Sequence, residues 1–146
     1  MKSDYIVYIA LGAAVLILGF TVWNMPSGGN NANADNFAGS SFQMKTAGTT
    51  SAGDVQIDLT PKGIVAGKFT VGFAANTHSV SMENFDLRKI TTLEYNGKSY
   101  SPTAAPQLSG HHNSGSLVFD LSETPKKFKI TISGIPNTEE RVFEWK

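Results

Sequence analysis

Short runs in which apolar and polar side chains alternate recur from residue 55 to the end of the chain. Such period-two patterns are typical of β-strands that bury one face. The runs begin near residues 55, 69, 90, 98, 117, 128 and 142, and turn-favouring residues separate them. This spacing predicts an all-β domain over residues 55–146. We expect an antiparallel sandwich of about seven strands, immunoglobulin-like or cupredoxin-like in shape.

Local signals within this domain refine the prediction. Asn96 and Gly97 stand between two of the runs and are the strongest short signal for a β-hairpin. The sequence Pro-Lys-Gly at residues 61–63 is typical of a turn, so we expect the first strand to end there. After residue 54 no ten-residue stretch has a helical period, although residues 81–89 have room for one helical turn.

The N-terminal segment has a different pattern. Residues 5–23 carry no charge, and at ~1.5 Å per residue a helix of this length nearly crosses the ~30 Å hydrocarbon core of a bilayer. Tyr5 and Trp23 stand at its two ends, where aromatic rings favour the lipid headgroups. A cleaved signal peptide is the alternative, but the nearest small-x-small site, at residues 32–34, lies far downstream. We therefore expect an uncleaved signal anchor, a single-pass transmembrane helix over residues 5–23.

The charges that flank this segment predict its orientation. Lys2 precedes it, and the next cation along the chain is Lys45. Because positively charged residues stay on the cytoplasmic side of a membrane, we expect residues 1–4 to be the cytoplasmic N-terminus. The C-terminal domain is then extracytoplasmic at the cell membrane, and the lipid bilayer is a partner through residues 5–23.

Residues 24–54 form a third region. Of its 31 residues, 22 are Gly, Asn, Ser, Thr or Ala. Such a composition buries too little apolar surface to offset the entropy of ordering the chain. We therefore expect a flexible stalk over residues 24–54, with a root-mean-square reach on the order of 30 Å.

Charge and cysteine content exclude several classes of function. The chain has 12 Lys and Arg residues against 12 Asp and Glu, whereas a protein that binds nucleic acid needs a surplus of cations. It contains no cysteine, which excludes disulfides, thiolate zinc sites and the Cys-ligated blue copper site. We expect no nucleic-acid partner.

Three histidines are the candidate metal ligands. If successive strands alternate in direction, the loop with His78 and the loop with His111 and His112 emerge at the same end of the sandwich. Imidazoles on loops of a rigid scaffold could bind copper or zinc. Adjacent residues of an extended chain point in opposite directions, so His111 and His112 reach one ion only if their loop curls. The alternative is that these histidines are solvated or hydrogen-bond to the backbone.

The sequence contains no recognisable catalytic pattern. Ser79 and Ser114 lie near histidines, but neither belongs to a G-x-S-x-G motif. Glu139 and Glu140 are adjacent, so they do not flank a bond as the two carboxylates of a glycosidase do. We therefore expect no catalytic residues and no enzymatic activity.

Three segments carry a resemblance to known proteins: T-H-S-V at residues 77–80, G-H-H-N-S-G-S-L-V-F at 110–119 and R-V-F-E-W at 141–145. Together they resemble an uncharacterised group of small prokaryotic β-sandwich proteins that are membrane-anchored or secreted. The resemblance covers about residues 54–146. It implies an exported sandwich domain and favours a functional role for the histidines, but it implies no activity.

These features lead to two hypotheses of different classes. The first is a membrane-tethered extracytoplasmic binding or assembly module without catalytic activity, which holds a protein partner or envelope component near the membrane. The second is a copper- or zinc-binding protein that uses His78, His111 and His112. A metal titration distinguishes them.

Overall fold

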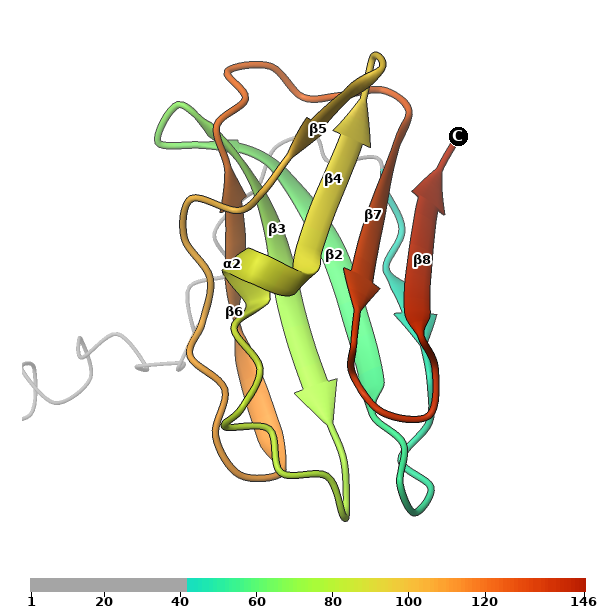
Figure 1. Cartoon of the computed structure of the whole chain (residues 1–146). Coiled ribbons are helices and arrows are strands. Elements are labelled where there is room, and N and C mark those ends of the chain that lie inside the picture. Colours follow the sequence, from blue (N-terminus) through green and yellow to red (C-terminus); the bar gives the residue numbers. More distant parts are fainter. Residues whose placement is uncertain (1–41) are drawn as a thin grey trace, which may run out of the picture. The chain divides into compact units, whose positions relative to one another are not determined.

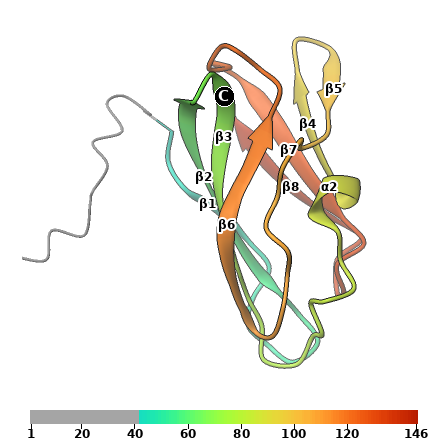
Figure 2. The same ribbon diagram turned by 90° about the vertical axis from the view of Figure 1, so that its left-hand side faces the viewer.

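The computed structural model describes residues 42–146, which form two four-stranded antiparallel sheets packed as a sandwich (Figure 1). The first sheet has the order β1 (Lys45–Ala47), β2 (Gln56–Val65), β3 (Lys68–Asn76), β6 (His112–Phe119). The second has the order β5 (Lys98–Tyr100), β4 (Thr91–Tyr95), β7 (Phe128–Ser133), β8 (Glu140–Trp145). Seen from the side, the two sheets form separate layers (Figure 2). The predicted all-β sandwich is confirmed, with eight strands instead of about seven.

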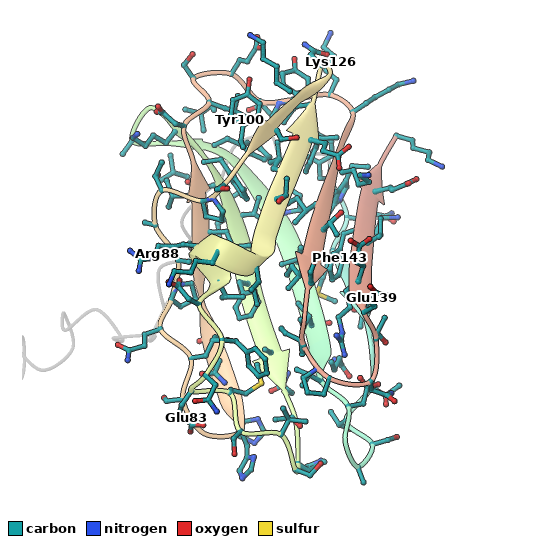
Figure 3. All side chains as sticks on the ribbon, viewed as in Figure 1. Glu83, Arg88, Tyr100, Lys126, Glu139 and Phe143 are labelled. Carbon is teal, nitrogen blue, oxygen red and sulfur yellow. The ribbon has the colours of Figure 1, made fainter. Side chains whose placement is uncertain are left out.

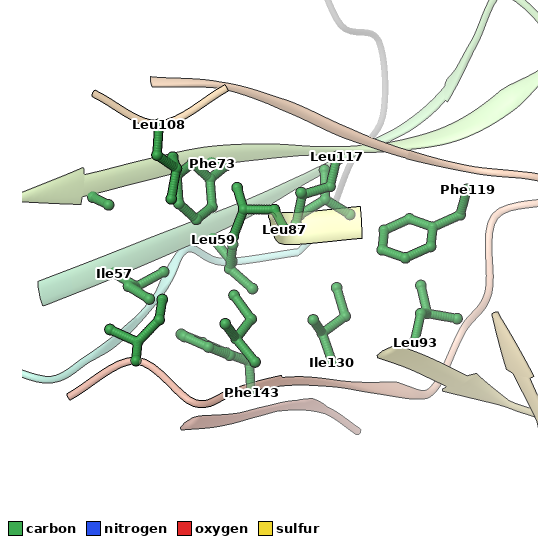
Figure 4. Packing of buried hydrophobic residues seen from close by; sticks show 14 of the residues in the cluster. Ile57, Leu59, Phe73, Leu87, Leu93, Leu108, Leu117, Phe119, Ile130 and Phe143 are labelled. Atoms are coloured by element: carbon green, nitrogen blue, oxygen red, sulfur yellow. The ribbon is translucent and has the colours of Figure 1, made fainter. Parts of the chain in front are cut away.

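The core lies between the sheets and is built by the alternating residues. Most apolar members of the runs are buried while their neighbours along the strand face outward, as the pattern of β7 illustrates. Figure 4 shows side chains from both sheets meeting in this layer. Phe69 contacts Phe128 edge-on at 5.2 Å between ring centroids, and Phe128 stacks on Trp145 at 4.7 Å. Aromatic packing therefore joins the sheets at one end of the core.

Two local predictions are confirmed. Asn96 and Gly97 connect β4 to β5, and both have positive φ angles, 50° and 72°. This conformation is the one that an Asn-Gly hairpin turn requires. The expected helical turn is α2 (Leu87–Ile90), and Asp86 caps it by accepting a hydrogen bond from the backbone N–H of Arg88.

The predicted turn at residues 61–63 is wrong. β2 continues through these residues to Val65, with a shift in register between Pro61 and Gly63. A β-bulge absorbs the extra residue, and the positive φ of Gly63, 81°, suits it. The turn comes instead at Ala66 and Gly67. Pro61 is tolerated because it lies beyond the last residue of β2 that pairs with β1.

The predicted boundary between stalk and domain is also wrong, because the folded domain includes residues 42–54. β1 lies in this segment and pairs with β2. The ring of Phe42 contacts Phe128 edge-on at 5.4 Å, and the indole Nε1 of Trp145 donates a 2.9 Å hydrogen bond to the carbonyl oxygen of Gln43. Main-chain pairing and one aromatic contact thus order a segment whose composition is typical of a flexible coil.

The predicted anchor at residues 5–23 and the rest of the predicted stalk, residues 24–41, lie outside the described residues. Both stay predictions. Within residues 42–146, no helix has the length and apolar character needed to cross a membrane.

Candidate functional site

The predicted convergence of the histidine-bearing loops is confirmed. Asn76, the last residue of β3, pairs with His112, the first residue of β6, and the backbone N–H of Thr77 donates to the carbonyl oxygen of His111 at 3.0 Å. We call this end of the sandwich the histidine end; it is the lower end in Figure 1, where the β7–β8 connection also lies. In Figure 3, Glu83 lies near this end.

The side chains of the three histidines are exposed. Nδ1 of His112 lies 2.8 Å from Oδ1 of Asn76, across the strand pair. Glu83 accepts a 2.8 Å hydrogen bond from the backbone N–H of Gly110, and this bond is the largest of the contributions that lower the pKa of Glu83. Among residues 42–146, no three His, Cys, Asp or Glu side chains gather closely enough to hold a metal ion. The structure brings the loops of His78, His111 and His112 together but not a set of ligands.

A buried ion pair, which sequence reasoning missed, lies at the same end. Nη2 of Arg141 is 2.7 Å from Oδ1 of Asp54, and their side chains are 1% and 7% exposed. The guanidinium also donates to the carbonyl oxygens of Ile135 at 2.9 Å and Pro136 at 2.8 Å. A buried charge is costly unless it is paired and hydrogen-bonded in this way.

Asp54 is held in its charged form. Burial raises the pKa of its carboxyl group, but hydrogen bonds from the backbone N–H groups of Val55 and Thr49, from the Thr49 hydroxyl and from Arg141 outweigh that effect. Together they lower the pKa to about 2. The carboxyl group of Asp54 is therefore ionised near neutral pH. A group with so low a pKa is poorly suited to general acid–base catalysis.

Further hydrogen bonds connect the loops around this pair. The hydroxyl of Thr77 donates to the carbonyl oxygen of Asp54 at 2.8 Å, and the same hydroxyl oxygen accepts from the backbone N–H of Val80 at 3.2 Å. The backbone N–H of Gly53 donates to Oγ of Ser79 at 2.7 Å. The histidine end is thus a cross-linked set of loops, and its polar groups mainly satisfy one another.

A second candidate site is an open groove along the side of the sandwich where β1 and β8 lie. It has a volume of about 620 Å³, and its lining comprises Phe42, Gln43, Lys45, Thr46 and residues 142–146. β8 is the last strand of its sheet, and Val142 at its centre is 46% exposed. An edge strand presents main-chain hydrogen-bonding groups on its outer side, so such a groove suits an extended polypeptide.

Comparison with known proteins adds no further assignment. No family model matches the chain, and neither a curated protein nor a solved structure matches it significantly. The function is therefore inferred from the sequence and the structure of the chain.

Proposed function

We propose that this protein is a membrane-tethered, extracytoplasmic binding or assembly module without catalytic activity. The uncharged run at residues 5–23 supports the single-pass anchor, and Lys2 supports a cytoplasmic N-terminus. Residues 42–146 form a sandwich with its own buried core, and Phe42 packs against that core. A short tether between the two would hold the module near the membrane.

The observation that carries the binding function is the groove beside β8. It lies between β8, which is an edge strand, and residues 42–46, through which the chain enters the described part of the domain. Glu140 and Glu144 point to solvent on β8, and outward charges of this kind oppose pairing between two copies of the same edge. The exposed Val142 between them is then available to an apolar side chain of a different protein. We infer a partner that adds one extended strand next to β8.

Site-specific photo-crosslinking in the native membrane tests this proposal. A photoreactive residue at Val142 of the full chain should form an adduct with one protein, and the cross-linked peptide should be an extended segment. The same residue at Ile64, which is 38% exposed on β2 outside the groove, is the matched control. Adding Val142→Lys to a probe at Thr46 should abolish the adduct.

Equal adducts from Val142 and Ile64, or an adduct that survives Val142→Lys, would contradict the binding function. Membrane anchoring is tested separately by alkaline extraction: the full chain should stay with the membrane, and a variant that lacks residues 5–23 should be released. The copper- or zinc-binding alternative is the weaker one, because the described histidines do not assemble into a three-ligand group.

A further inference from the structure

Lysines gather at the end of the sandwich opposite the histidines. We call this the lysine end; it comprises the β4–β5 hairpin, the loop over residues 120–127 and the adjoining ends of β7 and β8, and it is the upper end in Figure 1. A hollow of about 390 Å³ lies there, and its lining includes Lys98, Lys127, Lys129 and Lys146. Lys126, labelled in Figure 3, lies on the loop beside it.

Some of these lysines are neutralised within the domain. Nζ of Lys129 lies 2.9 Å from Oε1 of Glu94, and Nζ of Lys146 lies 2.9 Å from Oε2 of Glu144. The loop over residues 120–127 has two carboxylates: Asp120 lies 2.8 Å from Nζ of Lys68, and Glu123 accepts a 3.1 Å hydrogen bond from the hydroxyl of Tyr95.

Three exposed lysines of the lysine end have no such partner. Within the described part of the chain, no carboxylate lies within ion-pair distance of Lys98, Lys126 or Lys127. An unpaired ammonium group on a flexible side chain is a mobile donor to phosphate oxygens. The lysine end therefore has cationic groups free to bind an anionic surface.

The chain also enters the domain at the lysine end. Phe42, the first described residue, packs on Phe128, which directly follows Lys127, and Gln43 is bonded to Trp145. Because the domain includes residues 42–54, the predicted tether extends no further than residues 24–41. A flexible coil of that length has a reach of roughly 23 Å. A membrane anchor ahead of it would keep the lysine end, not the histidine end, next to the bilayer.

We propose that the lysine end docks on the phosphate groups of anionic lipid headgroups, an inference that rests on the membrane anchoring proposed above. Docking orients the sandwich with its histidine end away from the bilayer. The groove beside β8 then lies along the side of the sandwich, between its two ends. Each lysine near an anionic surface favours the docked state by roughly fivefold. The attraction is screened within about one Debye length, so it weakens with salt.

Fluorescence quenching on the full chain in vesicles tests the orientation. The natural sequence has no cysteine, so single labels can be placed through Ser122→Cys at the lysine end and Ser51→Cys at the histidine end, both exposed. The vesicles contain phosphatidylcholine alone or with about one third phosphatidylglycerol, and a headgroup quencher. We expect stronger quenching at residue 122 than at 51 in the anionic vesicles, and a smaller difference in neutral vesicles or high salt.

Matched charge variants distinguish an effect of the lysine end from an effect of the overall net charge of the protein. The double variant Lys126→Gln, Lys127→Gln should lower the equilibrium constant for docking by roughly 25-fold. The quenching difference should then fall toward its value in neutral vesicles. Arg88→Gln with Lys89→Gln removes the same charge beside α2 and should leave the difference intact. A difference that is insensitive to lipid charge, or equally reduced by both double variants, would overturn the proposal.

The outcomes also distinguish docking from anchoring. If anchoring fails, an alkaline wash releases the full chain from both kinds of vesicle. If only docking fails, the chain stays with the vesicles after the wash and the difference between the two labels is the same in anionic and neutral vesicles. Retention after the wash together with a lysine-dependent difference supports both.

Discussion

The two ends of the sandwich hold their charged groups in opposite ways. At the histidine end, Asp54 and Arg141 are buried and joined at 2.7 Å, and hydrogen bonds connect the surrounding loops. At the lysine end, Lys126 and Lys127 are exposed and without ion pairs among the described residues. A buried charge that loses its partner destabilises the fold, whereas an exposed unpaired charge is available to a ligand. The two ends therefore differ in kind: one has a buried ion pair that stabilises the fold, and the other has exposed charges that a ligand can reach.

The largest expected effect is the loss of the buried pair. Arg141→Met leaves the carboxylate of Asp54 buried without its cation, and the free energy of unfolding should fall by about 3–5 kcal/mol. Denaturant titration monitored by tryptophan fluorescence measures it. Lys68→Met is the control, because it breaks an exposed pair with Asp120 of similar length, 2.8 Å, and should cost less than about 1 kcal/mol. Equal losses would contradict the contrast between buried and exposed pairs.

The segment that enters at the lysine end should contribute less. Phe42→Ala removes a half-buried ring from its contact with Phe128, and we expect a loss of about 2 kcal/mol in the free energy of unfolding. Met44→Ala, two residues along, truncates a side chain that is 58% exposed and should change stability by less than about 0.5 kcal/mol. If the two variants are equally stable, the entry segment does not belong to the core.

Acid should weaken the histidine end through Asp54. Folding lowers the pKa of Asp54 from 3.8 to about 2, so the unfolded chain binds the proton more readily and stability rises with pH across this window. The stabilisation is complete above about pH 4 and is lost as the pH falls toward 2. Denaturant titrations at a series of pH values should show this slope, and Asp54→Asn should flatten it. An unchanged slope in Asp54→Asn would assign the acid sensitivity to other carboxyl groups.

The smallest expected effect concerns the histidines. His78→Ala, His111→Ala and His112→Ala together change three exposed side chains, so the free energy of unfolding should shift by no more than about 0.5 kcal/mol per residue. Calorimetric titration of the full chain with Cu(II) or Zn(II) should give no tight one-to-one binding that depends on them. One-to-one binding at micromolar affinity, lost in the triple variant, would instead establish the metal-binding function.

The parts of the fold that were predictable from the sequence depend on neighbouring residues. Alternation predicted six of the strands, and Asn96 with Gly97 predicted the hairpin and its short return strand, because both signals act within a few residues. The turn predicted at residues 61–63 was wrong because proline and glycine also suit a bulge. β1 was missed because three residues, Lys-Thr-Ala, carry no alternating pattern. Its existence depends on pairing with β2.

The candidate sites were predictable only in part. Strand direction correctly placed His78 near His111 and His112, but not the orientation of their side chains. Arg141 had a usable signal: it shares its face of β8 with Phe143 and Trp145, so an alternating pattern places this cation inward. A buried arginine requires a buried anion, but the pattern does not say which carboxylate supplies it.

The sequence by itself thus determined an all-β sandwich, its main strands and the end at which the histidine loops meet, because side-chain alternation and turn chemistry are local. Only the tertiary structure decided that Asp54 pairs with Arg141, 87 residues away, and that Phe42 and β1 belong to the domain. Contacts between distant segments depend on how the sheets pack, and that packing leaves no short-range pattern in the chain. The separation of a buried ion pair at one end from unpaired lysines at the other follows from this packing.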